Sequence, residues 1–387
     1  MTSLSPIRVA ILGTGSSLRT FHYPSVSQLP GKFVLHSVLE RTDKGIARAV
    51  CGSQIKVVNS LDAVLNDSEV DLVVIATPDN THFDFAKAAL KAGKHVLVEK
   101  PVCIHAADAI ELDQLARARG RILSVYQNRR WDSDFLTVKK VIASGQLGAL
   151  NEFTSCYDRY RPIFLNGDRY TGKHSQTSGS SWKEDPSESH GAIYLLGSHL
   201  IDQAYMLFGL PESLYCRVWD SRGNGVDECF DLQMTYAPPP GARGQFTCFL
   251  KSNNLSAIDP QLRFLVKGTN GSFVKYGLDP QCDQIAAGIL MSATCFGEED
   301  KSHWGEMVEG KAGRLEGEII RRTRVASERG SYLNIYENLF EAIKSGDREL
   351  LLVKPEETIQ VLKLIELALL SSEQGRALTS VDLRLCA

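Results

Sequence analysis

A glycine-rich segment near the start of the chain has the residue types that cradle a phosphate. It reads Gly13-Thr14-Gly15-Ser16-Ser17-Leu18 and follows an apolar run at residues 7–12. Gly13 permits a tight turn, and Gly15 lets backbone amides approach a pyrophosphate at the start of the next helix. A glycine-rich turn with no ligand is the alternative. We favour dinucleotide binding because the segment stands between a strand signal and a helix signal, although Leu18 fills the third position, where a small residue is usual.

Two residues of opposite charge follow the second apolar run, at residues 33–39. Glu40 could accept hydrogen bonds from the ribose of adenosine, which favours NAD. Arg41 could instead hold the 2′-phosphate of NADP. A solvated strand end is the alternative for either residue. The sequence therefore predicts NAD or NADP as the cofactor and does not choose between them.

The first third of the chain alternates strand and helix signals. Continuous apolar strands separated by helices predict a parallel sheet with both faces covered, and a ligand at the carboxyl ends of the strands. We expect an α/β protein that begins with a doubly wound Rossmann domain. Its strands are expected at residues 7–12, 33–39, 70–76, 95–98 and 121–126, and its helices at 44–50, 60–65, 81–92 and 104–118.

From about residue 151 the pattern changes to alternating strands separated by Gly, Pro and Asn turns, which predicts a large, mainly antiparallel sheet. We place a NAD(P)-binding domain at residues 1–126 and a C-terminal α+β domain for substrate binding and oligomerisation at 127–387. Residues 166–188 and 295–314 are expected to be long loops; the first could form a lid anchored by Trp182. Strands are expected at 153–160, 213–220, 229–236, 245–252, 262–267 and 272–276, and helices at 134–144, 191–208, 332–344 and 356–372.

Composition excludes several classes of protein. The 387 residues include 43 Lys and Arg against 46 Asp and Glu, so the formal net charge is −3. This argues against a nucleic-acid or anionic membrane surface, and no run of about 18 apolar residues could span a bilayer. The nine cysteines are scattered, which indicates free thiols in a reducing compartment, so we expect a cytoplasmic protein. No ligand spacing predicts a metal site.

Four further segments carry a resemblance to a known family. Residues 76–82 read ATPDNTH, 92–101 read AGKHVLVEKP, 128–132 read NRRWD and 197–202 read GSHLID. Together they resemble the Gfo/Idh/MocA oxidoreductases, the family of glucose–fructose oxidoreductase and inositol dehydrogenase. The resemblance covers nearly the whole chain. It implies a homodimer that associates through the exposed face of the C-terminal sheet.

The resemblance also implies site residues. Lys100 would lie beside the nicotinamide and contact the reacting oxygen, where a cation polarises a ketone or lowers the pKa of an alcohol. Glu99 would orient Lys100 or contact the nicotinamide ribose, and the Lys100–Pro101 peptide bond would be cis. The other cofactor contacts that the resemblance implies are Thr77, Pro78, Asn80, His82 and Asn128.

The second catalytic element of the family is a helix with Asp-x-x-x-His. His199 takes the histidine position and could shuttle a proton. The position four residues earlier is Leu195, where the family usually has aspartate. The usual Gly-Gly before the helix is reduced to His190-Gly191-Ala192. The usual proton relay is therefore incomplete. Compensation could come from Tyr194, from the 166–188 loop, or from Asp158, Arg159 and Arg161 on the neighbouring strand. A satisfied core histidine is the alternative interpretation of His199.

The substrate-facing strand is expected at residues 157–162. Arginine and tyrosine there suit a polyhydroxylated or carboxylated ligand, although a solvated edge strand is the alternative. We predict hydride transfer between nicotinamide and a sugar, cyclitol or other small hydroxy or keto compound. The alternatives are a dinucleotide-binding regulator without turnover, and an enzyme repurposed for imine reduction or a redox-neutral step. The predicted substrate-binding residues are Lys100, Tyr157, Arg159, Arg161, Tyr194 and His199.

Overall fold

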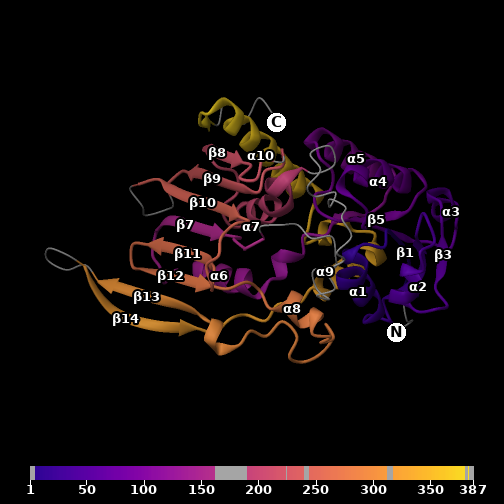
Figure 1. Ribbon diagram of the computed structural model, residues 1–387, viewed down its shortest axis with the longest axis horizontal. Helices are drawn as coiled ribbons and strands as arrows, with labels where there is room; N and C mark the ends of the chain where they lie inside the picture. The colour runs from indigo at the N-terminus through magenta and orange to yellow at the C-terminus, as the bar shows by residue number, and fades with distance from the viewer. Residues whose placement is uncertain are drawn as a thin grey trace.

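The protein folds around two β-sheets that lie side by side, with helices between and around them (Figure 1). The computed structural model describes residues 5–161, 190–223, 225–238, 244–311, 317–379 and 382. The predicted lid at 166–188, with its anchor Trp182, lies outside the described residues.

The first sheet has the parallel order β3-β2-β1-β4-β5-β6, which confirms the predicted doubly wound architecture. Strand β4 is buried along its whole length, as expected for a strand with helices on both faces. The sequence analysis did not predict β3, because a strand of three residues is too short to show a recognisable apolar pattern. The strands are β1 (Ile7–Leu12), β2 (Phe33–Leu39), β3 (Lys56–Val58), β4 (Leu72–Ile75), β5 (His95–Val98) and β6 (Leu123–Val125); the helices are α1 (Tyr23–Ser27), α2 (Ile46–Cys51), α3 (Leu61–Leu65), α4 (His82–Lys91) and α5 (Ala106–Ala118).

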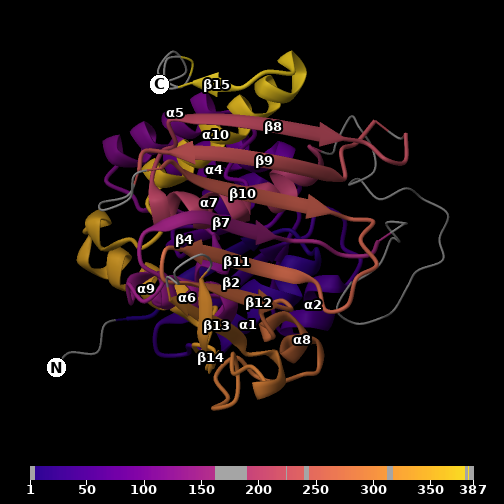
Figure 2. The ribbon, with the colours of Figure 1, turned by 90° about the vertical axis from the view of Figure 1, so that its left-hand side faces the viewer.

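The second sheet has the order β14-β13-β12-β11-β7-β10-β9-β8-β15. Only β7 and β10 pair in parallel, so the predicted, mainly antiparallel sheet is confirmed. Figure 2 shows one face of the sheet towards the viewer, with the helices behind it. The strands are β7 (Leu150–Cys156), β8 (Ser213–Trp219), β9 (Cys229–Tyr236), β10 (Phe246–Asn253), β11 (Leu262–Gly268), β12 (Gly271–Tyr276), β13 (Gly305–Lys311), β14 (Glu318–Val325) and β15 (Leu378–Thr379); the helices are α6 (Ser133–Ala143), α7 (Ser198–Phe208), α8 (Gln281–Ala286), α9 (Leu333–Ser345) and α10 (Pro355–Gln374).

The prediction of a loop at residues 295–314 was wrong, because β13 occupies much of it. Strand β13 pairs with β14 in a hairpin that extends away from the body of the molecule (Figure 1). Most residues of β14 are exposed, so backbone hydrogen bonds define this strand and no apolar alternation marks it in the sequence.

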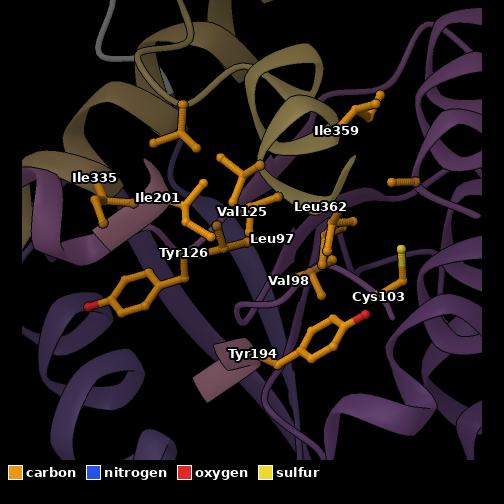
Figure 3. Close-up of a cluster of buried hydrophobic side chains, with 14 of the residues drawn as sticks. Leu97, Val98, Cys103, Val125, Tyr126, Tyr194, Ile201, Ile335, Ile359 and Leu362 are labelled. Atoms are coloured by element: carbon orange, nitrogen blue, oxygen red, sulfur yellow. The ribbon is translucent and has the colours of Figure 1, made fainter. Parts of the chain in front are cut away.

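The larger of two hydrophobic clusters in the described residues runs from the first sheet to the helices of the second domain. Figure 3 shows Leu97 and Val98 of β5 beside Leu362 of α10, with Ile201 of α7 close by. Helix α10 packs against both α5 and β8, which belong to different domains. This shared packing holds α7 over the carboxyl edge of the first sheet, where the predicted site residues gather.

Candidate functional site

The glycine-rich turn follows β1 at the carboxyl edge of the first sheet. Gly13 has φ +102°, and a Cβ there would lie 2.6 Å from the carbonyl oxygen of Ala76. A Cβ built on Gly15 would have no atom within 4 Å, so the backbone there is open to a close approach. Leu18 is fully buried and begins a π-helical segment, η1 (Leu18–His22), that continues into α1. The turn therefore fits a dinucleotide pyrophosphate. Thr14, Ser16 and Ser17 lie in the turn between the closely packed Gly13 and the buried Leu18.

The carboxylate of Glu40 is engaged by the backbone at the start of α2. The residue is 4% exposed. One oxygen accepts the backbone N–H of Lys44 at 2.9 Å and that of Ile46 at 3.2 Å, and the other accepts the N–H of Ala47 at 3.1 Å. Glu40 therefore caps the first turn of α2, a use that the sequence did not predict. The neighbouring Arg41 is exposed.

Lys100 follows β5, and its peptide bond to Pro101 is cis, as predicted. Its Nζ donates a hydrogen bond of 2.6 Å to the backbone carbonyl oxygen of Leu195. Leu195 belongs to a π-helical segment, η5 (Ile193–Gly197), which precedes α7. The main chain of Leu195 thus fixes the ammonium, whatever side chain stands at that position. Sequence reasoning could not find this contact because a backbone carbonyl has no residue-type signal.

Glu99 is connected to the first helix. Its Oε1 lies 3.2 Å from Nε2 of His22, whose Nδ1 lies 2.8 Å from the hydroxyl of Tyr336. Burial raises the pKa of Glu99, but the hydrogen bond from His22 and the charges of His22 and Lys100 outweigh it, so this pKa lies below its ordinary value. Glu99 is therefore an anion beside Lys100.

The turn after β4 is tied to the turn after β5 through His82. Its ring nitrogens lie 2.7 Å from the carbonyl oxygen of Pro101 and 3.0 Å from that of Thr77, and the residue is 1% exposed. His82 thus positions both turns, and its ring nitrogens face protein carbonyls. Pro78 and Asn80 are exposed in the same turn, whereas Asn128, after β6, is buried.

The segment before α7 docks on this edge at several points. The Tyr194 hydroxyl donates to the carbonyl oxygen of Ile104 at 3.1 Å, and Figure 3 shows its ring near Val98 and Cys103. His199 stands in the first turn of α7 and is 7% exposed. The predicted residues Lys100, Tyr194 and His199 are therefore brought to one region by the same helical segment.

The predicted substrate strand is shorter than expected, since β7 ends at Cys156. Tyr157 is buried, with the guanidinium carbons of Arg129 at 4.9 Å, Arg263 at 5.7 Å and Arg159 at 6.0 Å from its ring centre. Arg159 Nε donates to Asn254 at 2.6 Å, and the backbone N–H of Arg161 donates to the Asn254 carbonyl at 2.7 Å. Their contact with a substrate stays a prediction.

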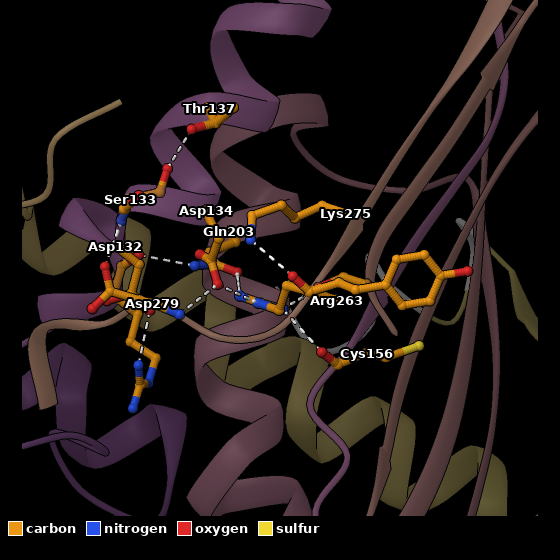
Figure 4. A network of polar contacts seen from close by, with 12 residues as sticks. Asp132, Ser133, Asp134, Thr137, Cys156, Gln203, Arg263, Lys275 and Asp279 are labelled. Atoms are coloured by element: carbon orange, nitrogen blue, oxygen red, sulfur yellow. Dashed lines mark hydrogen bonds and ion pairs between the residues drawn. The ribbon is translucent and has the colours of Figure 1, made fainter. Parts of the chain in front are cut away.

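A buried ionic network supports this region and was not predicted (Figure 4). Arg263 binds Asp134, Gln203 and the backbone of Cys156, while Asp279 accepts the N–H of Ser133 at 2.6 Å. Burial and the neighbouring carboxylates raise the pKa of Asp279 well above its ordinary range. The network joins α6, α7, β7 and β11.

Two classes of feature are missing from the part of the chain that the structure describes. No cluster of three or more His, Cys, Asp or Glu side chains there could hold a metal ion. None of its helices combines the length and apolar character that crossing a bilayer requires.

Comparison with known proteins identifies the chain. Residues 7–127 match the model of the oxidoreductase family with an NAD-binding Rossmann fold, and residues 135–274 match the GFO/IDH/MocA C-terminal domain. The chain belongs to the Gfo/Idh/MocA family. As a member it is an NAD(P)-dependent oxidoreductase. This confirms the resemblance and the prediction of NAD or NADP as cofactor.

The similarity to relatives in the family extends along almost the whole chain. An uncharacterized oxidoreductase of Schizosaccharomyces pombe is 36% identical over 383 residues, covering 97% of this chain and 100% of that one. The scyllo-inositol 2-dehydrogenase (NADP⁺) IolW of Bacillus subtilis is 33% identical over 373 residues, covering 96% and 95%. The solved structure of the Bacillus subtilis protein yvaA has a TM-score of 0.82 at 31% identity, covering 97% and 98%.

Proposed function

We propose that this oxidoreductase interconverts a secondary alcohol and a ketone on a small polyhydroxylated molecule, such as a sugar or a cyclitol. The observation that carries the proposal is the position of Lys100. Its ammonium lies at the carboxyl end of β5, where ligands of doubly wound sheets bind, and the Leu195 carbonyl holds it at 2.6 Å. The activity named for IolW, oxidation of scyllo-inositol, belongs to the same chemical class.

Each of three residues of the chain, Lys100, Glu99 and His199, has a distinct role in the proposed reaction. A bound nicotinamide would supply or accept the hydride. Lys100 would bind the reacting oxygen and stabilise the negative charge that develops on it. The anionic Glu99 keeps a counter-charge beside the lysine. His199 stands one helical turn after Leu195, and we propose that it hydrogen-bonds the reacting oxygen and shares its proton.

Turnover of a defined panel tests this function. Purified protein would be mixed with NADP⁺ or NAD⁺ and with scyllo-inositol, other cyclitols, sugars and simple secondary alcohols, and nicotinamide absorbance would be followed. We expect reduction of the cofactor by at least one polyhydroxylated alcohol and none by simple alcohols. A protein that binds the dinucleotide yet reduces it with no compound of the panel would contradict the proposal and favour a regulator.

We further propose that NADP(H) is the preferred cofactor. The residue Glu40 is buried, and its carboxylate accepts three backbone N–H groups of the α2 cap, which leaves it less acceptor capacity for an adenosine ribose. Arg41, next in the chain, is exposed and can bind a 2′-phosphate. The end of β2 thus carries an exposed cation at Arg41, while the Glu40 carboxylate is engaged by backbone N–H groups.

Arg41→Ala should weaken NADPH binding about 10- to 100-fold, because charge-assisted hydrogen bonds contribute about 1.5–3 kcal/mol. Binding of NADH should stay unchanged. Fluorescence titration of both cofactors measures this, with Arg119→Ala, an exposed arginine at the end of α5, as the matched control. Equal losses for NADPH and NADH, or no loss for either, would contradict the proposed role of Arg41.

We also propose a homodimer that forms through the outer face of the second sheet. Inward residues of β8 and β9 are buried, whereas Tyr215, Gln233 and Phe249 form a row on the opposite face of β8, β9 and β10. No helix within the described residues covers this face (Figure 2). Light scattering should give a dimer for the wild-type protein and a monomer for Tyr215→Glu/Phe249→Glu. A wild-type monomer would contradict the proposal.

A further inference from the structure

Asp79 is a buried carboxylate that the mechanism above does not use. It stands in the turn after β4 and is 5% exposed. Neither of its oxygens accepts a hydrogen bond from any residue within the described ranges, and both oxygens are buried. An uncompensated buried carboxylate is costly, so this position requires a cationic or hydrogen-donating neighbour. Since its oxygens are covered, Asp79 is not placed to bind a ligand directly.

His190 is that neighbour. Its Nδ1 lies 3.4 Å from Oδ2 of Asp79, which is within ion-pair range but long for a hydrogen bond. Such catalytic contacts are often long without ligand and shorten in the complex. Nδ1 is buried, but the side chain is 27% exposed, so the exposed part of the ring lies on the side away from Asp79. A carboxylate behind Nδ1 holds the proton there and leaves Nε2 as a base.

The surroundings of His190 fix its position. Its ring packs edge-on against Tyr194, with centroids 5.5 Å apart. Asp227 accepts the N–H groups of Ala192 at 2.8 Å and Ile193 at 3.2 Å, and burial raises the pKa of Asp227 to about 6. Gly191 has φ +71°, and a Cβ there would collide with this carboxylate. The backbone of the turn that carries His190 is therefore held closely against Asp227.

His190 and His199 flank the lysine contact. His190 lies five residues before Leu195 and is separated from η5 by Gly191 and Ala192, and His199 stands four residues after Leu195, in α7. The His190 ring contacts Tyr194, the neighbour of Leu195 in the chain, and Leu195 supplies the carbonyl that holds Lys100, so His190 lies beside the segment that makes the lysine contact. They differ in access to solvent, because His199 is 7% exposed whereas the His190 side chain is 27% exposed. Release of a proton to water needs the more exposed group.

We propose that His190, held by Asp79, is the residue through which the reacting proton exchanges with solvent. This inference rests on the proposed alcohol–ketone chemistry. In the oxidising direction the C–H electron pair leaves as hydride to the nicotinamide, and the O–H proton, which His199 shares, passes on to Nε2 of His190. The Nδ1 proton stays on the side of Asp79, which stabilises the imidazolium. His190 then gives the Nε2 proton to water. Asp79 is a positioning residue.

Kinetics of His190→Gln test the proposal. We expect kcat to fall about 100-fold or more, since general acid–base catalysis contributes about 10²–10⁴-fold, with little change in KM or in NADPH binding. The slowing of kcat in deuterium oxide should become larger than in the wild-type protein. Asp79→Asn should shift both quantities in the same direction, whereas His303→Gln, which replaces an exposed histidine at the end of η6 (Lys301–His303), should not. Wild-type kcat in His190→Gln would overturn the proposal.

NMR of the imidazole nitrogens tests the contact between Asp79 and His190 without requiring turnover. In ¹⁵N-histidine-labelled protein the His190 signal, assigned by its loss in His190→Gln, should show the tautomer protonated at Nδ1. Asp79→Asn should shift it toward the tautomer protonated at Nε2. An Nε2-protonated His190 in the wild-type protein, or one indifferent to Asp79→Asn, would overturn the proposal. If the wild-type protein turns over no substrate, the proposed function fails. The NMR measurement still shows whether Asp79 holds the Nδ1 proton of His190.

Discussion

Lys100→Met is expected to lower kcat at least about 10²–10³-fold, the loss that follows removal of one donor to a developing oxyanion. Methionine keeps the length of the side chain but carries no charge and no N–H group. The Leu195 carbonyl would lose its donor, and the reacting oxygen would lose the cation that polarises it. The measurement is nicotinamide absorbance with the best alcohol of the panel, in both directions.

The control separates chemistry from binding. Lys91→Met, at the exposed end of α4, removes a lysine far from the carboxyl edge of the sheet and should leave kcat unchanged. Binding of NADPH to Lys100→Met should remain within a fewfold of wild type, because the proposed pyrophosphate and adenosine contacts lie elsewhere. A Lys100→Met protein with more than a tenth of wild-type kcat would show that this lysine is not at the reacting oxygen.

The fold was predictable where burial leaves a pattern. The first sheet is buried on both faces, so its longer strands appear as continuous apolar runs, and the cis Lys100–Pro101 bond came with the family motif. Strand β14 was not predictable, because an exposed hairpin needs only backbone pairing. The Rossmann turn was found because glycine at positive φ is demanded by backbone geometry.

The site was less predictable because its contacts use groups that carry no sequence signal. The direction of the Glu40 carboxylate depends on a loop that returns three backbone amides to it. Lys100 is fixed by a main-chain carbonyl of a π-helical segment. Asp79 and His190 meet only because the second domain packs on the first. For Tyr157, Arg159 and Arg161 the substrate role stays a prediction.

The buried network gives the largest expected effect on stability. Arg263 is 1% exposed and donates to Asp134 at 2.9 Å, to Ser155 at 2.9 Å and to Gln203 at 3.0 Å, while its guanidinium lies 4.1 Å from the ring centre of Phe264. Arg263→Met fills a similar volume but removes the charge. It leaves Asp134, which is fully buried, without its counter-ion.

Arg263→Met should therefore lower the free energy of unfolding by about 3–5 kcal/mol, the cost of breaking one partner of a buried pair. Urea unfolding followed by circular dichroism measures it. Arg322→Met breaks the exposed pair with Glu306, whose side chains are 58% and 34% exposed, and should cost about 0–1 kcal/mol. The double variant Asp134→Asn/Arg263→Met should recover part of the loss, because no unpaired carboxylate then remains at position 134. A single variant as stable as Arg322→Met would contradict the prediction, because Asp134 would then not need Arg263 as its counter-ion.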